Sequence, residues 1–116
     1  MSWYGVKNIQ LAQEWLENHS PDLIVLSINK TIKSEDLALI HNSSARTPAI
    51  PVIVIAESDE LDYRVKVARN GGCGFLVQPN AAQIWDLTQQ LLEHDRASKA
   101  ERNFTTKILV VDDDPV

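Results

Sequence analysis

Hydrophobic positions along the chain follow two different periods in alternation. Short unbroken apolar runs, such as the four residues that directly precede Ser27, are typical of buried parallel strands. Between them apolar residues recur at helical spacing, as in Ile9, Ala12 and Leu16, with Trp15 near the edge of that face. The pattern predicts alternating strands and helices, and therefore a parallel sheet with right-handed crossovers and helices on both faces.

The predicted elements begin with a strand near Trp3. The helices expected after it are Ile9–Asn18, Glu35–His41, Asp59–Arg69 and one that starts after Asn80. The remaining strands are expected at Asp22–Ser27, Ile50–Ala56, Gly74–Gln78 and Ile108–Val111.

Residue types at the helix ends and faces refine this prediction. Ser34 is the expected N-cap of the second helix. The third helix is expected to turn Leu61, Val65 and Ala68 toward the core. Asn80, with a glutamine three residues later, has the spacing of a capping box.

The length of 116 residues suits one domain. Composition turns polar and charged from residue 93 to residue 106, which predicts a helix end that runs into a linker. The expected division is a domain over residues 1–95, a linker over 96–106 and a separate strand within 107–116.

Composition and charge narrow the classes of function. The formal net charge of −5 argues against nucleic-acid binding, which needs a basic face. The single cysteine, Cys73, allows neither an internal disulfide nor a zinc cluster. No apolar run is long enough to span a membrane, and the N-terminus lacks the layout of a signal peptide. We therefore expect a cytoplasmic protein.

Several segments, taken in order, are similar to those of one known family. They are Pro21-Asp-Leu-Ile-Val-Leu, Ile50-Pro-Val-Ile-Val-Ile, Asn70-Gly-Gly, Gly74-Phe-Leu-Val-Gln-Pro79 and the closing Lys107-Ile-Leu-Val-Val-Asp-Asp-Asp-Pro. Their order and spacing resemble the response-regulator receiver domain of two-component signalling. The resemblance implies a flavodoxin-like, doubly wound parallel sheet of five strands.

The family's phosphotransfer chemistry needs residues that this chain lacks. The phosphoacceptor position falls on Ser27, whose neutral hydroxyl cannot form the family's acyl phosphate. The Ser/Thr position falls on Ala56 and the Lys position on Gln78. Phe75 matches the aromatic that changes rotamer on activation, and the alternative interpretation is a half-buried strand aromatic without a switching role. The resemblance therefore implies a degenerate pseudo-receiver that is not an enzyme and has no cofactor.

An acidic pair remains at the end of the last strand. Asp112 and Asp113 match the family's magnesium ligands, although the missing third-strand aspartate implies only weak magnesium binding. The alternative interpretation of the run Asp112–Asp114 is a solvated loop. An alternative function follows from the same pair, namely a working phosphoryl acceptor or Mg-binding receiver built on these two carboxylates.

The family's first strand and first helix are absent before Trp3. The apolar run Ile108–Val111 looks like that first strand, so it either opens a following receiver domain or completes this one. The missing strand is an interior one, and an unfilled interior position leaves backbone groups unpaired. We expect Ile108–Val111 to lie between the strands near Trp3 and Leu23, parallel to both, in permuted order within one chain or swapped between two.

These features predict a signalling module that acts through a protein partner in a two-component or phosphorelay regulator. A spacer that only positions its neighbours is a third hypothesis. Because the family's first helix is missing, one face of the sheet should lie partly bare. We expect a homodimer, or burial of Trp3, Tyr4 or the long fourth helix over that face.

Overall fold

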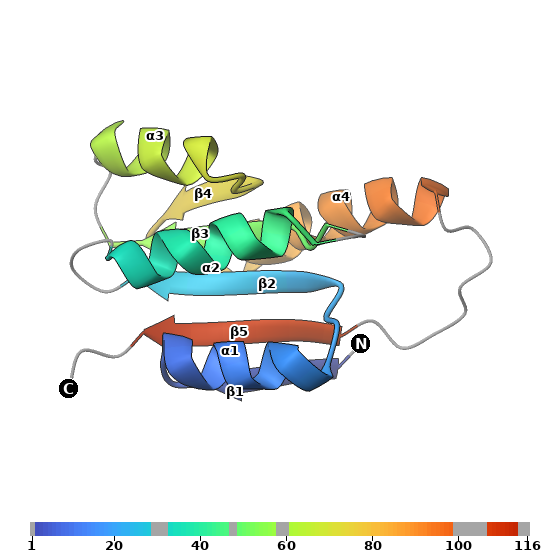
Figure 1. The fold of residues 1–116 in the computed structure, drawn as a ribbon. Helices are drawn as coiled ribbons and strands as arrows, with labels where there is room; N and C mark the ends of the chain where they lie inside the picture. Colours follow the sequence, from blue (N-terminus) through green and yellow to red (C-terminus); the bar gives the residue numbers. More distant parts are fainter. Residues whose placement is uncertain (1, 29–32, 47–48, 58–60, 99–106, 114–116) are drawn as a thin grey trace.

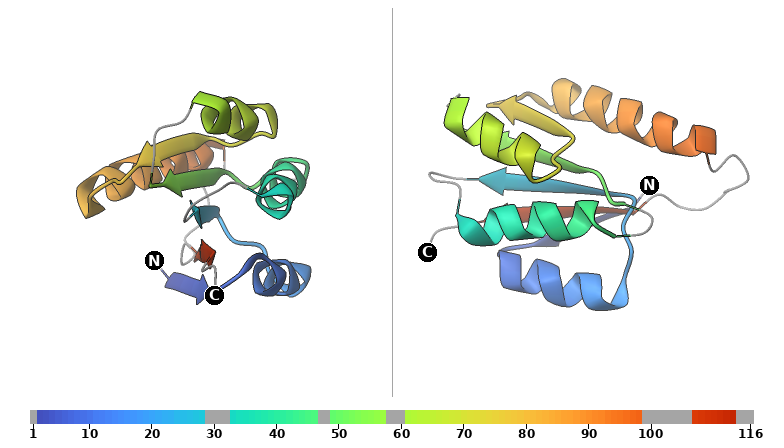
Figure 2. Two further views of the ribbon diagram at one scale, coloured as in Figure 1. Left: turned by 90° about the vertical axis from the view of Figure 1, so that its left-hand side faces the viewer. Right: turned by 45° about the horizontal axis from the view of Figure 1, so that its top comes forward.

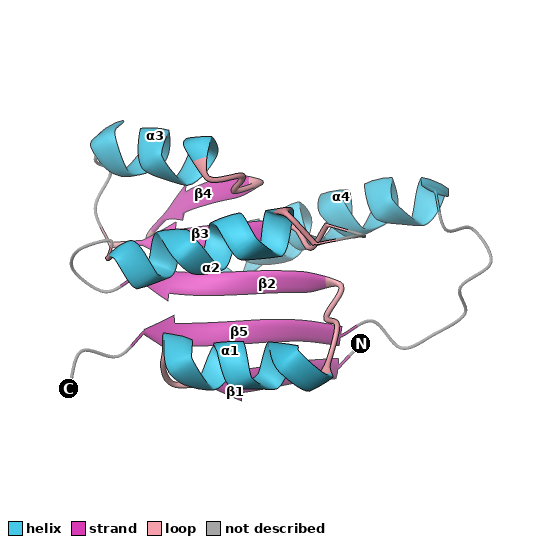
Figure 3. Ribbon diagram, in the orientation of Figure 1, coloured by secondary structure: helices cyan, strands magenta, loops and turns pink. Residues whose placement is uncertain are grey.

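A single sheet of five parallel strands organises the chain (Figure 1; Figure 3). The computed structural model describes residues 2–28, 33–46, 49–57, 61–98 and 107–113. The strands are β1 (Ser2–Val6), β2 (Leu23–Ile28), β3 (Val52–Ala56), β4 (Gly74–Val77) and β5 (Lys107–Asp113), and the helices are α1 (Ile9–Asn18), α2 (Ser34–Ser44), α3 (Leu61–Arg69) and α4 (Ala81–Ser98). The fold is thus α/β, with the predicted flavodoxin-like doubly wound sheet.

The last strand of the chain occupies the interior of the sheet. The strand order is β1-β5-β2-β3-β4, so β5 lies between the first two strands. In its register Ile108 pairs with Trp3 on one side and with Leu23 on the other. Both ladders are parallel. The predicted position of Ile108–Val111 is confirmed, and it is filled by the same chain.

Asp22 anchors the beginning of β5. Its backbone N–H donates to the Lys107 carbonyl at 2.8 Å, and its carboxylate Oδ2 accepts from the Lys107 N–H at 2.8 Å. The two bonds together hold Lys107, the first residue of β5, against the residue that directly precedes β2. Asp22, predicted as the first residue of the second strand, therefore helps to set the register of the inserted strand.

The strand boundaries differ from prediction where a backbone group bonds elsewhere. The third strand starts at Val52 instead of Ile50, because the Ile50 N–H donates to the Ser43 carbonyl at the end of α2. The fourth strand ends at Val77, because Gln78 adopts a left-handed φ of 42°. The second strand is shifted by one residue, to Leu23–Ile28.

The prediction for α3 is correct in type and wrong in orientation. Leu61 is 75% exposed, and Val65 and Ala68 are also exposed. Val67 is the buried residue, and Tyr63 packs with it against the core. The two candidate stripes of this nine-residue helix have the same spacing, so only the contact with the sheet distinguishes them. The predicted residues 59 and 60 lie outside the described residues.

The other helices match the prediction with changes at their ends. α1 has the predicted bounds and buries Ile9 and Ala12. Ser34 is the first residue of α2 and does not cap it; instead the Lys33 N–H donates to the Asp36 carboxylate at 2.8 Å. α2 also runs on to Ser44, past the predicted end at His41. The capping box of α4 is confirmed, with Asn80 and Gln83 exchanging bonds of 2.8 and 3.0 Å.

Helix α4 extends into the segment expected to be a linker. α4 continues to Ser98, beyond the expected domain boundary at residue 95. The rest of the expected linker, residues 99–106, lies outside the described residues. The division into domain, linker and separate strand stays a prediction.

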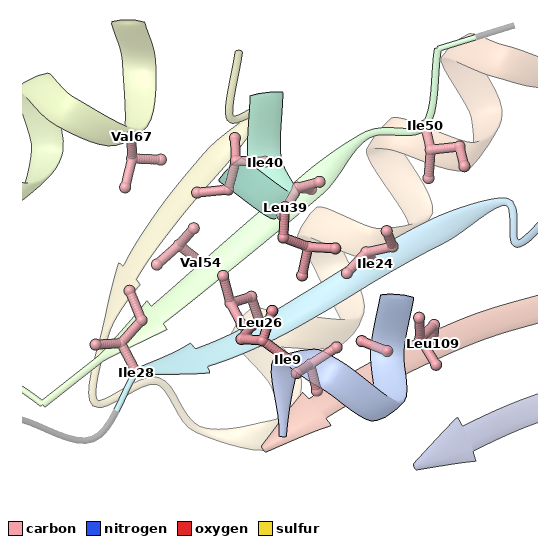
Figure 4. Packing of buried hydrophobic residues seen from close by; sticks show 13 residues of the cluster. Ile9, Ile24, Leu26, Ile28, Leu39, Ile40, Ile50, Val54, Val67 and Leu109 are labelled. Atoms are coloured by element: carbon pink, nitrogen blue, oxygen red, sulfur yellow. The ribbon is translucent and has the colours of Figure 1, made fainter. Parts of the chain in front are cut away.

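The two faces of the sheet are covered unequally. Helices α1, α2 and α3 lie on one face, while α4 alone lies on the other, beside β3 and β4 (Figure 2). The larger core cluster lies under the three helices, where Ile24 and Leu26 of β2 meet Ile9, Leu39 and Ile40 (Figure 4). Under α4 the buried cluster is smaller, with Leu23, Val25, Ile53 and Ile108. Among the described residues no helix covers β5 and β1 on the α4 side (Figure 2).

Replacing Asp22 should weaken the attachment of β5. Asp22→Ala removes a charge-assisted hydrogen bond to the Lys107 N–H, so we expect the free energy of unfolding to fall by about 1–2 kcal/mol and the Lys107 amide to exchange faster. Asp22→Asn keeps an oxygen acceptor and should lose less. Urea unfolding and amide hydrogen exchange measure both effects, and unchanged Lys107 exchange in Asp22→Ala would contradict the anchor.

Replacing Thr88 should stabilise the α4 side of the core. Thr88 is fully buried, and its hydroxyl has no hydrogen-bond partner among the described residues. Thr88→Val keeps the shape and removes the unpaired polar group, so we expect a gain of about 1 kcal/mol in unfolding free energy. Thr88→Ser, which keeps the hydroxyl and loses the methyl group, should be less stable than the parent protein. Thermal or urea unfolding tests the order Val, Thr, Ser.

Candidate functional site

The carboxyl ends of β5, β2 and β3 lie side by side along one border of the sheet, across the strand ends (Figure 1). We call this border the carboxyl edge, as distinct from the edge strands β1 and β4. This edge is where ligands bind in open α/β sheets. The ladders place Ser27 between Asp112 of β5 and Ile55 of β3. The sequence-predicted positions Ser27, Ala56 and Asp112 therefore lie on three adjacent strands, and Gln78 follows the fourth.

Ser27 and Asp112 form the polar part of this edge. They are in register on neighbouring parallel strands, whose axes are about 4.8 Å apart, so their side chains share the α4 face. Ser27 is half-buried and Asp112 is exposed. The pair combines one neutral hydroxyl with one solvated carboxylate. Such a pair can donate and accept hydrogen bonds, but it offers no cation to a phosphoryl group.

Ala56 contributes only a methyl group to the edge. It is 3% exposed and pairs with Ile28 and Val77. By strand alternation it lies on the same face of β3 as Val52 and Val54, which belong to the larger core cluster. A methyl group in this position cannot bond an oxyanion. The structure accordingly gives Ala56 a packing role.

Gln78 is engaged by the backbone of the neighbouring strand. Its N–H donates to the Ala56 carbonyl at 2.9 Å, and its side-chain Nε2 donates to the Glu57 carbonyl at 2.9 Å. Its φ of 42° lies in the left-handed region, which non-glycine residues adopt rarely. The two bonds hold the chain in this conformation as it leaves β4. The side-chain amide therefore stabilises the fold, a role for which the sequence contains no signal.

Phe75 lies away from Ser27, in β4, which β3 separates from β2. It is half-buried against the larger core cluster, and the Arg64 guanidinium carbon is 5.2 Å from its ring centroid. A cation over the ring face favours one side-chain position. The predicted rotamer switch of Phe75 stays a prediction.

The acidic pair supplies few metal ligands. Asp112 pairs with Ser27, and the backbone of Asp113 pairs with Ile28. In the part of the chain whose side chains are described, no group of three or more His, Cys, Asp or Glu side chains comes together. Divalent cations such as magnesium need several oxygen ligands in a fixed geometry. Magnesium binding by Asp112 and Asp113 stays a prediction.

Comparisons with known proteins add no family to this picture. Neither the models of known protein families nor the curated protein sequences give a match to this chain. Within the described residues, the helices are too short or too polar to cross a membrane.

Placing a second carboxylate beside Asp112 should reveal whether this edge can hold a cation. Ser27→Asp sets two like charges on neighbouring strands, so we expect the unfolding free energy to fall by about 1 kcal/mol at neutral pH. Magnesium should restore part of this loss in Ser27→Asp and leave the neutral control Ser27→Asn unchanged. Urea unfolding with and without magnesium measures both, and equal magnesium responses of the two variants would contradict the arrangement.

Proposed function

We propose that this chain is a receiver-like signalling module that acts through protein–protein contact and does not accept a phosphoryl group. One observation carries the proposal. Ser27, Ala56 and Gln78 lie at the carboxyl ends of the strands, where ligands bind in open α/β sheets. Ser27 is not an anionic nucleophile, Ala56 has no hydroxyl, and Gln78 has no positive charge. Phosphoryl transfer depends on positioning and on neutralising the charge of the transferring group, and these side chains provide neither.

The packing of the sheet is a second observation that supports this proposal. The strands at the edge keep a dense core, with Leu26, Val54 and Val111 all fully buried. The scaffold is therefore intact where the chemistry is missing. A folded module with an inert edge is suited to binding a partner in a two-component or phosphorelay regulator. Such a role places the chain in the cytoplasm, where its exposed cysteine, Cys73, stays reduced.

Asp112 favours one alternative. It is exposed at the carboxyl end of an interior strand, and it matches one of the family's magnesium ligands. The alternative function is a phosphoryl-acceptor or Mg-binding receiver that uses Asp112 and Asp113. It differs from the first proposal in its response to phosphoryl donors.

Beryllofluoride with magnesium separates the two functions, because it mimics an acyl phosphate on a carboxylate. We expect the amide NMR signals of residues 26–28 and 110–112 in the parent protein to stay unchanged, and mass spectrometry after acetyl phosphate treatment to find no phosphorylated aspartate. A stable aspartyl phosphate on Asp112 or Asp113 would overturn the proposal in favour of the alternative.

A restored variant supplies the positive control. Ser27→Asp/Ala56→Ser/Gln78→Lys returns the three missing groups to their strands, and the double variant Ala56→Ser/Gln78→Lys serves as the matched chain without the acceptor. We expect beryllofluoride to shift the signals of the triple variant only. A folded triple variant that does not respond would contradict the receiver-like arrangement of this edge.

A further inference from the structure

The first strand, β1, forms an open edge of the sheet. Its ladder runs to β5, and within the described residues no other strand pairs with it (Figure 1). An edge strand offers unpaired backbone N–H and C=O groups to any strand that can approach. Natural edges are usually protected by charged residues or proline, and Ser2–Val6 contains neither. This edge therefore lacks the common barriers to strand pairing.

The exposed side chains of β1 alternate between the two faces of the sheet. Trp3 and Gly5 are in register with Ile108 and Val110, so they lie on the α4 side, where β1 has no helix cover among the described residues. Trp3 is 46% exposed. Tyr4, on the opposite face, is 39% exposed and contacts Trp15 of α1, with ring centroids 5.3 Å apart.

Gly5 leaves an empty space beside the exposed Trp3. A Cβ built on Gly5 would have no atom within 4 Å. The space is open on a face whose neighbouring residue, Val110, is only half-buried. One aromatic side chain and one vacant position of the same face thus lie two residues apart on the same strand.

These two features are complementary in a two-fold arrangement. If two copies of β1 run antiparallel with Tyr4 on the two-fold axis, Trp3 of each copy lies opposite Gly5 of the other. Each indole can then cover the vacant position at Gly5 and the half-buried Val110 of the second copy, which removes apolar surface from water. A two-fold axis makes the contact self-complementary and closed, so pairing stops at two copies.

We infer that β1 binds β1 of a second copy of this chain in antiparallel orientation, centred on Tyr4, and joins the two sheets into one of ten strands. The inference stands apart from the signalling role proposed above. Each copy has a formal net charge of −5, so the dimer is weakened by repulsion, and salt should strengthen it by screening.

Sedimentation velocity over a range of protein concentrations tests the association. We expect a concentration-dependent dimer whose fraction rises with added salt. Gly5→Lys places a charged side chain in the vacant position, which a monomer tolerates because no atom is near, and it should make the protein monomeric with an unchanged circular dichroism spectrum. Gln90→Lys, with the same charge change at an exposed position of α4, is the matched control and should keep the dimer.

Engineered cysteines test the register. In a Cys73→Ser background, which removes the exposed native thiol, Tyr4→Cys puts two cysteines directly opposite each other. The Cα separation of such a pair is about 4.5–5.5 Å, which a disulfide can span. Ser2→Cys in the same background is the control, because its two copies lie four residues apart along the paired strands. We expect a disulfide-linked dimer with Tyr4→Cys and little with Ser2→Cys.

Any one of four outcomes would overturn the inference. The first is a protein that stays monomeric at every concentration and salt level. The second is a dimer that Gly5→Lys leaves intact, which would place the contact elsewhere on the surface. The third is efficient crosslinking at residue 2 and none at residue 4, which would indicate a different register. Oligomers that grow beyond two copies would also contradict the closed two-fold pairing.

Discussion

The two backbone ladders of β5 are the interaction on which the rest of the structure depends. Without β5, β1 would have no strand partner, and the backbone groups of β2 that face it would be unpaired in a buried layer. β5 also supplies Leu109 and Val111 to one core cluster and Ile108 to the other. This one strand therefore forms backbone ladders with both of its neighbours and contributes side chains to the core on both faces of the sheet. The Asp22–Lys107 contact decides where that strand begins.

Much of this arrangement could be predicted because the sequence contains strong local signals. The apolar run at residues 108–111 has the composition of a buried strand, and the resemblance to receiver domains implied an interior position for it. The Asn80 capping box is also a local pattern. α3 could not be oriented, because Tyr63 and Val67 repeat with the same spacing as Leu61 and Val65. In such a short helix the packing against the sheet decides between two equivalent stripes.

The residues at the carboxyl ends of the strands could be predicted from the sequence, but their hydrogen bonds could not. The resemblance assigned Ser27, Ala56 and Gln78 to strand ends, and the structure places them there. It could not indicate that the Gln78 amide holds the Glu57 carbonyl, because that bond depends on a left-handed backbone. Asp22 and Lys107 are 85 residues apart, and no sequence period links residues at that separation. Long-range polar contacts of this kind follow from the completed fold.

The position of β5 also has a consequence for the way the chain reaches its native state. During synthesis β1 and β2 emerge well before residues 107–113, so the two strands must wait with an unfilled gap between them. The contacts that β5 makes with β1 and β2 join residues that are far apart in the sequence. A large mean sequence separation of contacting residues is associated with slow folding. The unfinished intermediate exposes the edges of β1 and β2 that border the gap, in addition to the two outer edges of the sheet. Until β5 arrives, these open edges can pair with strands of other chains.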